Sequence, residues 1–223
     1  MDEEETKQIS KDEENLIYKD SLNYYLNHSW NQCHDRILPL LLKFNKFEQK
    51  YFHLFINSGI KSKEIGASSI IFQLQNLQKY INSDTKNKLK FAISLTLFKS
   101  KEFAQSYLIL KNILVDEINE PNAWYLLGKI YFEYQKIEES SQCFFNSIKL
   151  NRNNFRVYDK LGNIYFTKKL FNESLQFYLM SIYLLKKFFD ENFVEYKILK
   201  LRIKIASVQC LLNKSTLKIS LGM

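Results

Sequence analysis

The chain has 223 residues, of which 46% are hydrophobic and 15% aromatic, enough for one medium domain or one short helical repeat array. Only 5 glycines and 2 prolines are available for turns, which argues against a strand-rich fold. The formal net charge is +8, and no apolar run reaches transmembrane length. The acidic opening Met1–Glu5 lacks an apolar core, so we expect neither a secretory signal nor a transit peptide.

The N-terminal part, residues 1–86, is predicted to be an acidic tail followed by diverged helices. Residues 1–9 are polar and charged, which predicts disorder. Ser10 followed by Glu13 forms a capping-box pattern, because the hydroxyl can accept a bond from the first helical turn and the carboxylate can reach back to the Ser10 amide. We therefore expect a helix to about Asn27, with Leu16, Leu22 and Leu26 among its apolar positions.

The rest of the diverged part, within residues 10–86, is also helical in character. Either a helix begins near Asp35 and holds Pro39 in its first turns, or a longer helix kinks at Pro39. Gly59 is predicted to end a helix. A further helix is expected over residues 70–81, and Ser83 or Asp84 is expected to cap the next one.

A spacing of 34 residues organises the centre of the chain. Gly128 and Gly162 are 34 residues apart, and their neighbourhoods match. The matched positions are Trp124, Leu127, Gly128, Tyr131, Ser140, Phe144 and Ser147 with Tyr158, Leu161, Gly162, Tyr165, Ser174, Tyr178 and Ser181. We count positions within each copy from Pro121 and from Phe155. Small residues at positions eight and twenty let two antiparallel helices approach, and large residues at positions four, seven, eleven and twenty-four fill the space between them.

This pattern resembles the tetratricopeptide repeat. The resemblance implies an all-α fold, an α-solenoid of stacked antiparallel helix pairs, with repeats at 87–120, 121–154 and 155–188. The copy at 87–120 is degenerate, because Lys90 and Ile113 depart from positions four and twenty-seven. The proline common at position thirty-two is absent, so the resemblance does not predict the structure of the turns between repeats.

Residues 189–223 are predicted to form a capping helix and a tail. Val194, Ile198, Leu201, Ile205, Val208 and Leu212 recur at helical spacing and form one apolar stripe. Lys197, Lys200 and Lys204 lie on another face, where they either meet an anionic partner or are solvated. A repeat stack needs a terminal helix over its last apolar face, and this segment is the candidate.

No residue set indicates chemistry. His28, Cys33 and His34 are close in sequence but lack a fourth ligand at the spacing of a structural zinc site. Phosphate loops and hydrolase motifs are absent from the sequence. We therefore expect no enzyme activity, no metal and no cofactor. The three separated cysteines favour reduced thiols in the cytoplasm or nucleus.

The resemblance also implies where a partner binds. In the family, ligands lie along the concave surface formed by the first helix of each pair, which here holds the partner-binding candidates Asn122, Tyr125, Lys129, Phe132, Arg156, Asp159, Asn163 and Phe166. In the degenerate copy the same positions include Phe91, Leu95 and Phe98, which are either exposed or covered by the N-terminal helices. The carboxylate clamp of chaperone-binding members is not matched, since Asp159 would repel a carboxylate.

The leading hypothesis is a non-catalytic adaptor or scaffold for protein partners, including acidic segments. Residues 1–20 carry 8 acids and 3 bases, so the rest of the chain is strongly basic. The assignment to a subunit of a large assembly, resembling the anaphase-promoting complex or ciliary transport complexes, rests on loose similarity. The alternative is an RNA-binding helical-repeat protein that uses the basic surface. Partner identity and oligomeric state do not follow from the sequence.

Overall fold

The computed structural model describes residues 9–42, 49–62, 64–77 and 83–188, together with 201, 204, 205, 207–209, 211 and 212. All regular elements within these residues are helices, which confirms the predicted all-α class. The chain divides into two compact units, residues 1–118 and 119–223, and each is described by itself. Among the described helices, none is long and apolar enough to cross a membrane.

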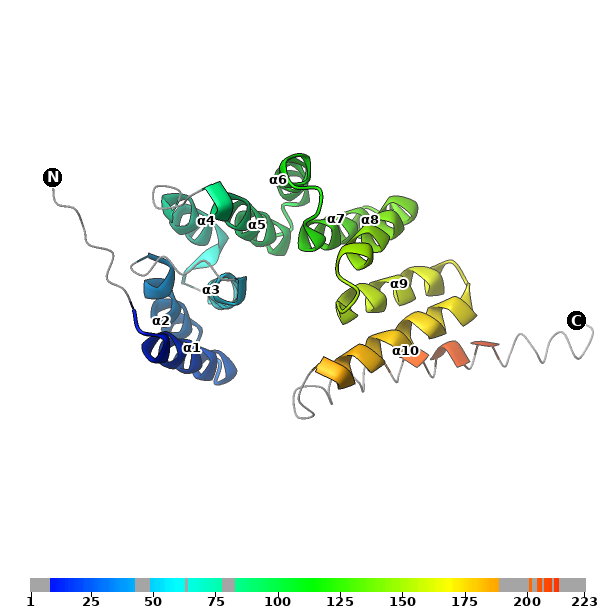
Figure 1. Ribbon diagram of the computed structural model, residues 1–223, viewed down its shortest axis with the longest axis horizontal. Coiled ribbons are helices and arrows are strands. Elements are labelled where there is room, and N and C mark those ends of the chain that lie inside the picture. Colours follow the sequence, from blue (N-terminus) through cyan, green and yellow to red (C-terminus); the bar gives the residue numbers. More distant parts are fainter. Residues whose placement is uncertain are drawn as a thin grey trace, which may run out of the picture. The chain divides into compact units, whose positions relative to one another are not determined.

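Unit 1 contains α1 (Lys11–Leu26), α2 (Trp30–Leu42), α3 (Gln49–Lys61), α4 (Gly66–Asn76), α5 (Ser83–Lys99) and α6 (Phe103–Asp116) (Figure 1). The predicted cap of α1 is present, because the Ser10 hydroxyl accepts a bond of 3.2 Å from the Glu13 amide. Helix α3 packs against α1, α2, α4 and α5, so it lies at the centre of the unit. Leu95 of α5 is buried, and Phe91 and Phe98 are half-buried, so this copy's apolar positions are largely covered.

Three details of unit 1 correct the sequence predictions. Pro39 lies inside α2, which begins at Trp30, so of the two alternatives the start near Asp35 is wrong and a longer helix runs through Pro39. Gly59 does not end a helix but lies within α3. A Cβ there would lie 2.7 Å from Ile70 and 3.0 Å from His34, so this glycine permits close packing. Helix α4 begins before the predicted residue 70, and residues 78–82 lie outside the described part of the chain.

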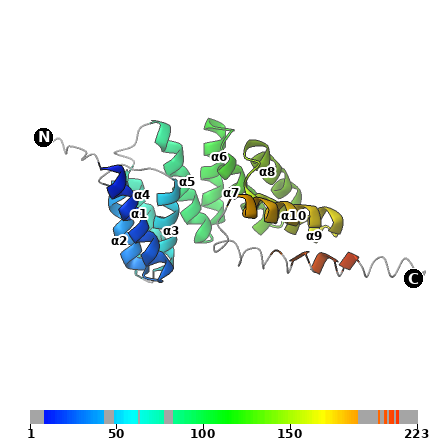
Figure 2. The same ribbon diagram turned by 60° about the horizontal axis from the view of Figure 1, so that its bottom comes forward.

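Unit 2 contains α7 (Pro121–Glu133), α8 (Ile137–Leu150), α9 (Phe155–Thr167) and α10 (Phe171–Phe188), seen from a second direction in Figure 2. Pro121 occupies the first turn of α7, where its missing N–H removes no helical bond. In the turn between α8 and α9, Arg152 stands at the family's proline position, and the Asn154 side chain caps α9 by accepting a bond from the Arg156 amide. Both α7 and α9 thus begin with a residue suited to a helix N-terminus.

The packing positions of the repeat pattern hold each helix pair together. The Ser140 hydroxyl donates to the Gly128 carbonyl and the Ser174 hydroxyl to the Gly162 carbonyl, both over 2.8 Å. A Cβ on Gly128 would lie 2.8 Å from the Phe144 ring, and one on Gly162 only 2.3 Å from the Tyr178 ring. The other packing residues are buried or half-buried: Trp124, Leu127, Tyr131, Tyr158, Leu161 and Tyr165. Glycine is therefore required where each aromatic ring crosses.

The same frame continues into the degenerate copy of unit 1. Ser106 donates to the Ser94 carbonyl over 2.8 Å, as Ser140 and Ser174 do in the later pairs. The turns repeat as well, because Lys101, Gln135 and Lys169 have φ values of 66°, 59° and 60° at positions 34 residues apart. Left-handed backbone of this kind is a common way to end a helix. Lys90, which departs from the family pattern, is paired with Asp116 over 2.8 Å.

The α1–α2 pair follows this frame too, although its sequence gives no sign of it. His28 has φ 61° between the two helices. Counted from that turn, Ser21 and Cys33 occupy the two small positions, and both are fully buried. Ile37 occupies the large position that Phe144 and Tyr178 hold in unit 2, and it is also fully buried. The N-terminal part therefore begins with a diverged helix pair of the same type.

The described residues of the C-terminal segment pack against the last helix pair. The described residues between 201 and 212 are helical. Leu201 and Val208 are buried in a cluster with Phe155, Tyr178 and Leu185, and Ile205 and Leu212 pack against it. The remaining predicted stripe residues, Val194 and Ile198, lie outside the described residues, as do Lys197 and Lys200.

Candidate functional site

The predicted partner-binding residues lie on α7 and α9 of unit 2. We call the surface formed by six of them the α7–α9 face: Asn122, Tyr125, Lys129, Arg156, Asp159 and Asn163. Arg156 is exposed and the other five are half-buried. Side chains of α7 and α9 share one apolar cluster, in which Tyr125 and Phe132 pack with Val157, Leu161 and Ile164. The two helices thus place these residues on neighbouring parts of one unit.

Tyr125 is the residue of this face whose contacts are best defined. Its ring lies 5.9 Å from that of Phe144, which anchors it to α8, and the Lys129 ammonium lies 5.8 Å from its centroid. Burial raises the pKa of Tyr125 to about 12; the positive charge of Arg156 opposes this shift, and the negative charge of Asp159 adds to it. A tyrosine hydroxyl is protonated near neutral pH, so this one can donate a hydrogen bond to a partner, with a cation and a carboxylate nearby.

The two predicted phenylalanines have a larger structural role than the sequence indicated. Phe132 packs against the cluster of Val157, Leu161 and Ile164, and Phe166 packs against the last apolar cluster. The Phe166 ring also meets that of Phe171 edge-on, at 5.7 Å between centroids. Each is half-buried, so only part of each ring is available to a partner.

Asp159 and Asn163 are engaged by contacts within the unit. Asp159 forms an ion pair with Lys204 of the C-terminal segment and accepts a hydrogen bond from its ammonium group. Asn163 accepts a bond of 2.9 Å from the Tyr178 hydroxyl. The Lys204 ammonium also lies 5.2 Å from the Tyr178 ring centroid, so these four residues form one connected group. Of the predicted lysine stripe, Lys204 is the described member, and it is paired with a residue of the same unit.

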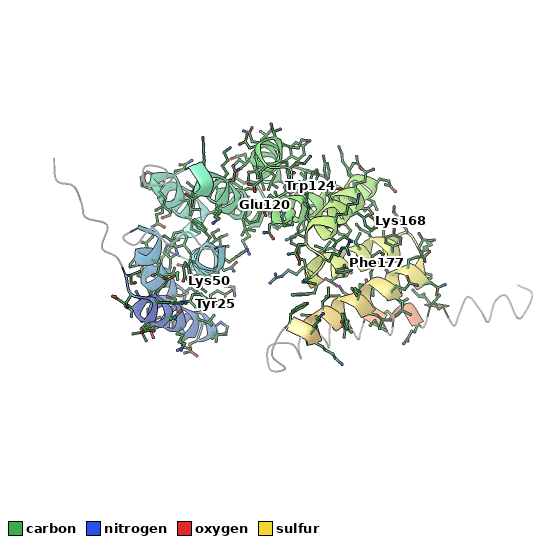
Figure 3. All side chains as sticks on the ribbon, viewed as in Figure 1. Tyr25, Lys50, Glu120, Trp124, Lys168 and Phe177 are labelled. Atoms are coloured by element: carbon green, nitrogen blue, oxygen red, sulfur yellow. The ribbon has the colours of Figure 1, made fainter. Side chains whose placement is uncertain are left out.

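Arg156 of this face and several cations and aromatic rings elsewhere in unit 2 make contacts within the unit. The Arg156 guanidinium lies 5.0 Å from the Phe155 ring, and Lys168 pairs with Glu138 over 3.0 Å. The ring of Phe177 meets those of Tyr165 and Phe145, at 4.9 Å and 6.3 Å between centroids. Figure 3 labels Lys168 at the turn after α9 and Phe177 on α10. The ring contacts of Phe177 and the Lys168–Glu138 pair join neighbouring helices.

Unit 1 carries a second group of lysines on aromatic rings, which the sequence did not reveal. Lys61 lies 4.5 Å and 4.3 Å from the ring centroids of Tyr25 and Trp30. Lys50 lies 4.7 Å from that of Tyr51, and Figure 3 labels it together with Tyr25. A shallow cavity of about 490 Å³ adjoins Lys61 and Trp30. Its lining residues are His28, Ser29, Trp30, Asn31, Gln32, Lys61, Ser62 and Glu64. Its lining mixes both charges, so it favours no single ligand class.

The histidine and cysteine cluster is accounted for by packing. His34 is buried, with Nδ1 3.2 Å from the Phe55 carbonyl oxygen and Nε2 3.0 Å from the Gln73 side-chain oxygen. Burial lowers the pKa of His34 and raises that of the Cys33 thiol. Within the residues that the structure describes, no three His, Cys, Asp or Glu side chains are grouped as metal ligands would be.

Comparison with known proteins places this geometry in a family. Residues 121–154, which form α7 and α8 and the turn after them, match the tetratricopeptide repeat model. No curated protein sequence matches the chain significantly. Among solved structures, PilF of Pseudomonas aeruginosa is similar with a TM-score of 0.55 and 14% identity, over 90% of each chain.

A second similar structure is that of MamA from Desulfovibrio magneticus RS-1. Its TM-score is 0.51 at 13% identity, over 78% of this chain and 96% of that one. At such identities the similarity concerns the fold alone. Together with the family match and the packing of Gly128, it leads to one conclusion: the chain carries a tetratricopeptide repeat within an all-helical fold of packed helix pairs.

Proposed function

We propose that the protein is a non-catalytic adaptor or scaffold, which binds a segment of a protein partner on the α7–α9 face. The observation that carries this proposal is Tyr125, a half-buried tyrosine held by Phe144 and flanked by Lys129 and Arg156. Tyrosine and arginine are the residue types that most often dominate binding energy at interfaces. A tyrosine fixed by packing loses little side-chain entropy when it binds.

The test is a variant with Tyr125, Lys129 and Arg156 all changed to alanine. Partners would first be identified by affinity capture and mass spectrometry, and binding would then be measured with the purified partner. We expect a loss of at least about tenfold in affinity, which corresponds to one moderate hot spot. Normal binding by a folded triple variant would remove the α7–α9 face as the main site.

A matched control keeps the charge change constant. Lys149 and Arg152 are exposed residues of unit 2 that lie on α8 and in the turn after it. Changing both to alanine removes the same two positive charges, but away from Tyr125. This control should bind the partner with wild-type affinity, and both variants should show the helical circular dichroism of the parent.

RNA binding is the second candidate, and the charge of unit 2 is the observation that favours it. Residues 119–223 contain 16 lysines and arginines against 9 aspartates and glutamates, a net of +7. Salt separates the two candidates. RNA affinity should fall steeply between low and moderate ionic strength, because many phosphates are contacted, whereas a peptide that adds one or two charge pairs to an anchored tyrosine should lose less affinity.

The proposal extends to a place in a larger complex, for which an assembly such as the anaphase-promoting complex or a ciliary transport complex is the working example. Repeat proteins of this architecture present long surfaces that suit such subunits. Native-size fractionation of cell extract tests this extension. Elution of the whole pool at the size of the 26.7 kDa chain would contradict membership of a stable assembly.

A further inference from the structure

We propose that Lys204 determines which charge the α7–α9 face accepts: by pairing with Asp159, it adapts the face to an acidic partner segment. This inference rests on the proposed function and specifies the partner's chemistry. Asp159 is the acidic member of the six residues that form the face. Unpaired, it would repel a carboxylate brought toward Tyr125, and Lys204 removes that repulsion.

The contact is held in place by the core. Leu201 and Val208 of the C-terminal segment are buried against Phe155, Tyr178 and Leu185, and Ile205 and Leu212 pack around them. Lys204 lies three residues after Leu201 and four before Val208, so burial of these two side chains fixes the helix turn that carries it. The pair is partly shielded from water, since the Lys204 side chain is 34% exposed and that of Asp159 is 28% exposed.

The pair also acts on Tyr125. The charge of Asp159 contributes to the raised pKa of both Tyr125 and Tyr178, so this carboxylate is near the tyrosine of α7 as well as that of α10. Lys204 offsets the charge of Asp159, while Lys129 and Arg156 bring positive charge close to Tyr125. The excess of basic residues in unit 2 acts in the same direction, because it attracts acidic segments from a distance.

The matching partner is a segment that presents a glutamate or aspartate beside an apolar side chain. The carboxylate would be attracted to Arg156 and Lys129, and the apolar group would cover the accessible part of the Tyr125 ring. A basic segment would meet repulsion at the same place. The preference is thus set by a residue outside the repeat pattern, on the C-terminal segment.

The test uses two fluorescein-labelled peptides of about 12 residues, a length that suits an extended or helical segment. One mixes Glu, Leu and Tyr, and the other has Lys in place of Glu. Fluorescence anisotropy measures their affinity for the full chain, and NMR shifts locate the acidic peptide. We expect the wild type to prefer the acidic peptide and to show shifts around Tyr125.

Three variants isolate the role of Lys204. Lys204→Met keeps the aliphatic packing but leaves Asp159 charged, so it should weaken acidic binding about fivefold, the range of one partly exposed charge pair. Adding Asp159→Asn should restore the affinity, because no unpaired carboxylate remains. Lys186→Met removes one charge from an exposed position of α10 and should have little effect.

Each outcome decides one claim. Unchanged acidic binding by Lys204→Met, or no recovery in the double variant, overturns the role of Lys204. The same is true if the wild type binds both peptides equally or neither of them. The proposed function fails separately if the acidic peptide binds the wild type and the triple alanine variant equally well. Thermal melting of every variant shows whether a loss of binding comes from unfolding.

Discussion

The α1–α2 pair of unit 1 and the α9–α10 pair of unit 2 have the same turn but different sequences. His28 and Lys169 have φ values of 61° and 60°. After each of them the backbone closes in the same way: the Ser29 amide donates to the Tyr24 carbonyl, and that of Leu170 to the Tyr165 carbonyl, both over 2.9 Å. Neither turn residue is glycine, although glycine is the usual choice for this conformation.

The two pairs differ at the small positions. Gly162 and Ser174 are joined across the helices by a hydroxyl bond of 2.8 Å. In α1 the hydroxyl of Ser21 turns back to the Ile17 carbonyl of its own helix over 2.7 Å, and Cys33 has no hydroxyl to offer. Ile37, with a branched aliphatic side chain, fills the place of the Tyr178 ring. The helix pair therefore needs two small residues and a matching large one, and several combinations satisfy this requirement.

The largest loss of stability should come from Gly162, the position that accepts no larger side chain. Gly162→Leu places side-chain atoms where the Tyr178 ring already lies, since even a Cβ would be 2.3 Å away. We expect a loss of about 3 kcal/mol or more in the free energy of unfolding, because a packed core cannot absorb the added volume. Urea unfolding of the full chain measures it.

Ser21→Ala provides the matched change in α1. That position already holds a Cβ, and the hydroxyl lost there has a partner in its own helix, so we expect a cost of about 1 kcal/mol. Equal stability losses for Gly162→Leu and Ser21→Ala would show that ring contact at Gly162 does not limit packing.

The first and last helices of the chain give the second contrast. Val208→Asp buries a carboxylate in the cluster of Phe155, Tyr178 and Leu185, and should cost about 3 kcal/mol or cause aggregation. Leu26→Glu on α1 should be nearly neutral, since that side chain is 64% exposed. Light scattering and thermal melting distinguish the two. A stable, monomeric Val208→Asp protein would contradict the capping role of the C-terminal segment.

The smallest effect concerns pH and should come from unit 1 alone. His34 is buried against the Phe55 ring, which is stacked at 4.2 Å, and burial lowers its pKa, although Gln73, the Phe55 carbonyl and Asp35 oppose the shift. The unfolded chain therefore binds a proton more readily, with a pKa of about 6.5. The stability from neutral His34 is fully present above about pH 6.5 and is lost as the pH falls toward its folded pKa.

Comparison of wild type with His34→Gln isolates this contribution. Unfolding free energies would be measured at several pH values between about 5 and 8, where histidine is the side chain whose ordinary pKa lies in range. The wild type should lose up to about 1.4 kcal/mol per pH unit more than the variant below about pH 6.5. Parallel curves of unfolding free energy against pH for the two proteins would mean that protonation of His34 does not destabilise the folded state.

The sequence by itself determined the helix pairs of residues 121–188. Gly128, Gly162, Ser140 and Ser174 are positions where a larger side chain meets an aromatic ring or breaks a cross-helix bond, so the pattern survives in the sequence. The caps at Ser10 and Pro121 were predictable for a similar reason, since each depends on residues within one helical turn. A helix cap and a close helix crossing each accept only a few residue types, so both can be recognised in the sequence.

The tertiary structure alone decided the rest. Ser21, Cys33 and Ile37 form a helix pair of the same type without the family residues, because packing constrains the combined volume and not each residue. Gly59 was predicted to end a helix, but it lies within α3, where Ile70 and His34 pack too close to it for a side chain. Lys204 and Asp159 are 45 residues apart, and no periodic pattern links them. Their contact depends on where Leu201 and Val208 are buried, which is a property of the assembled core.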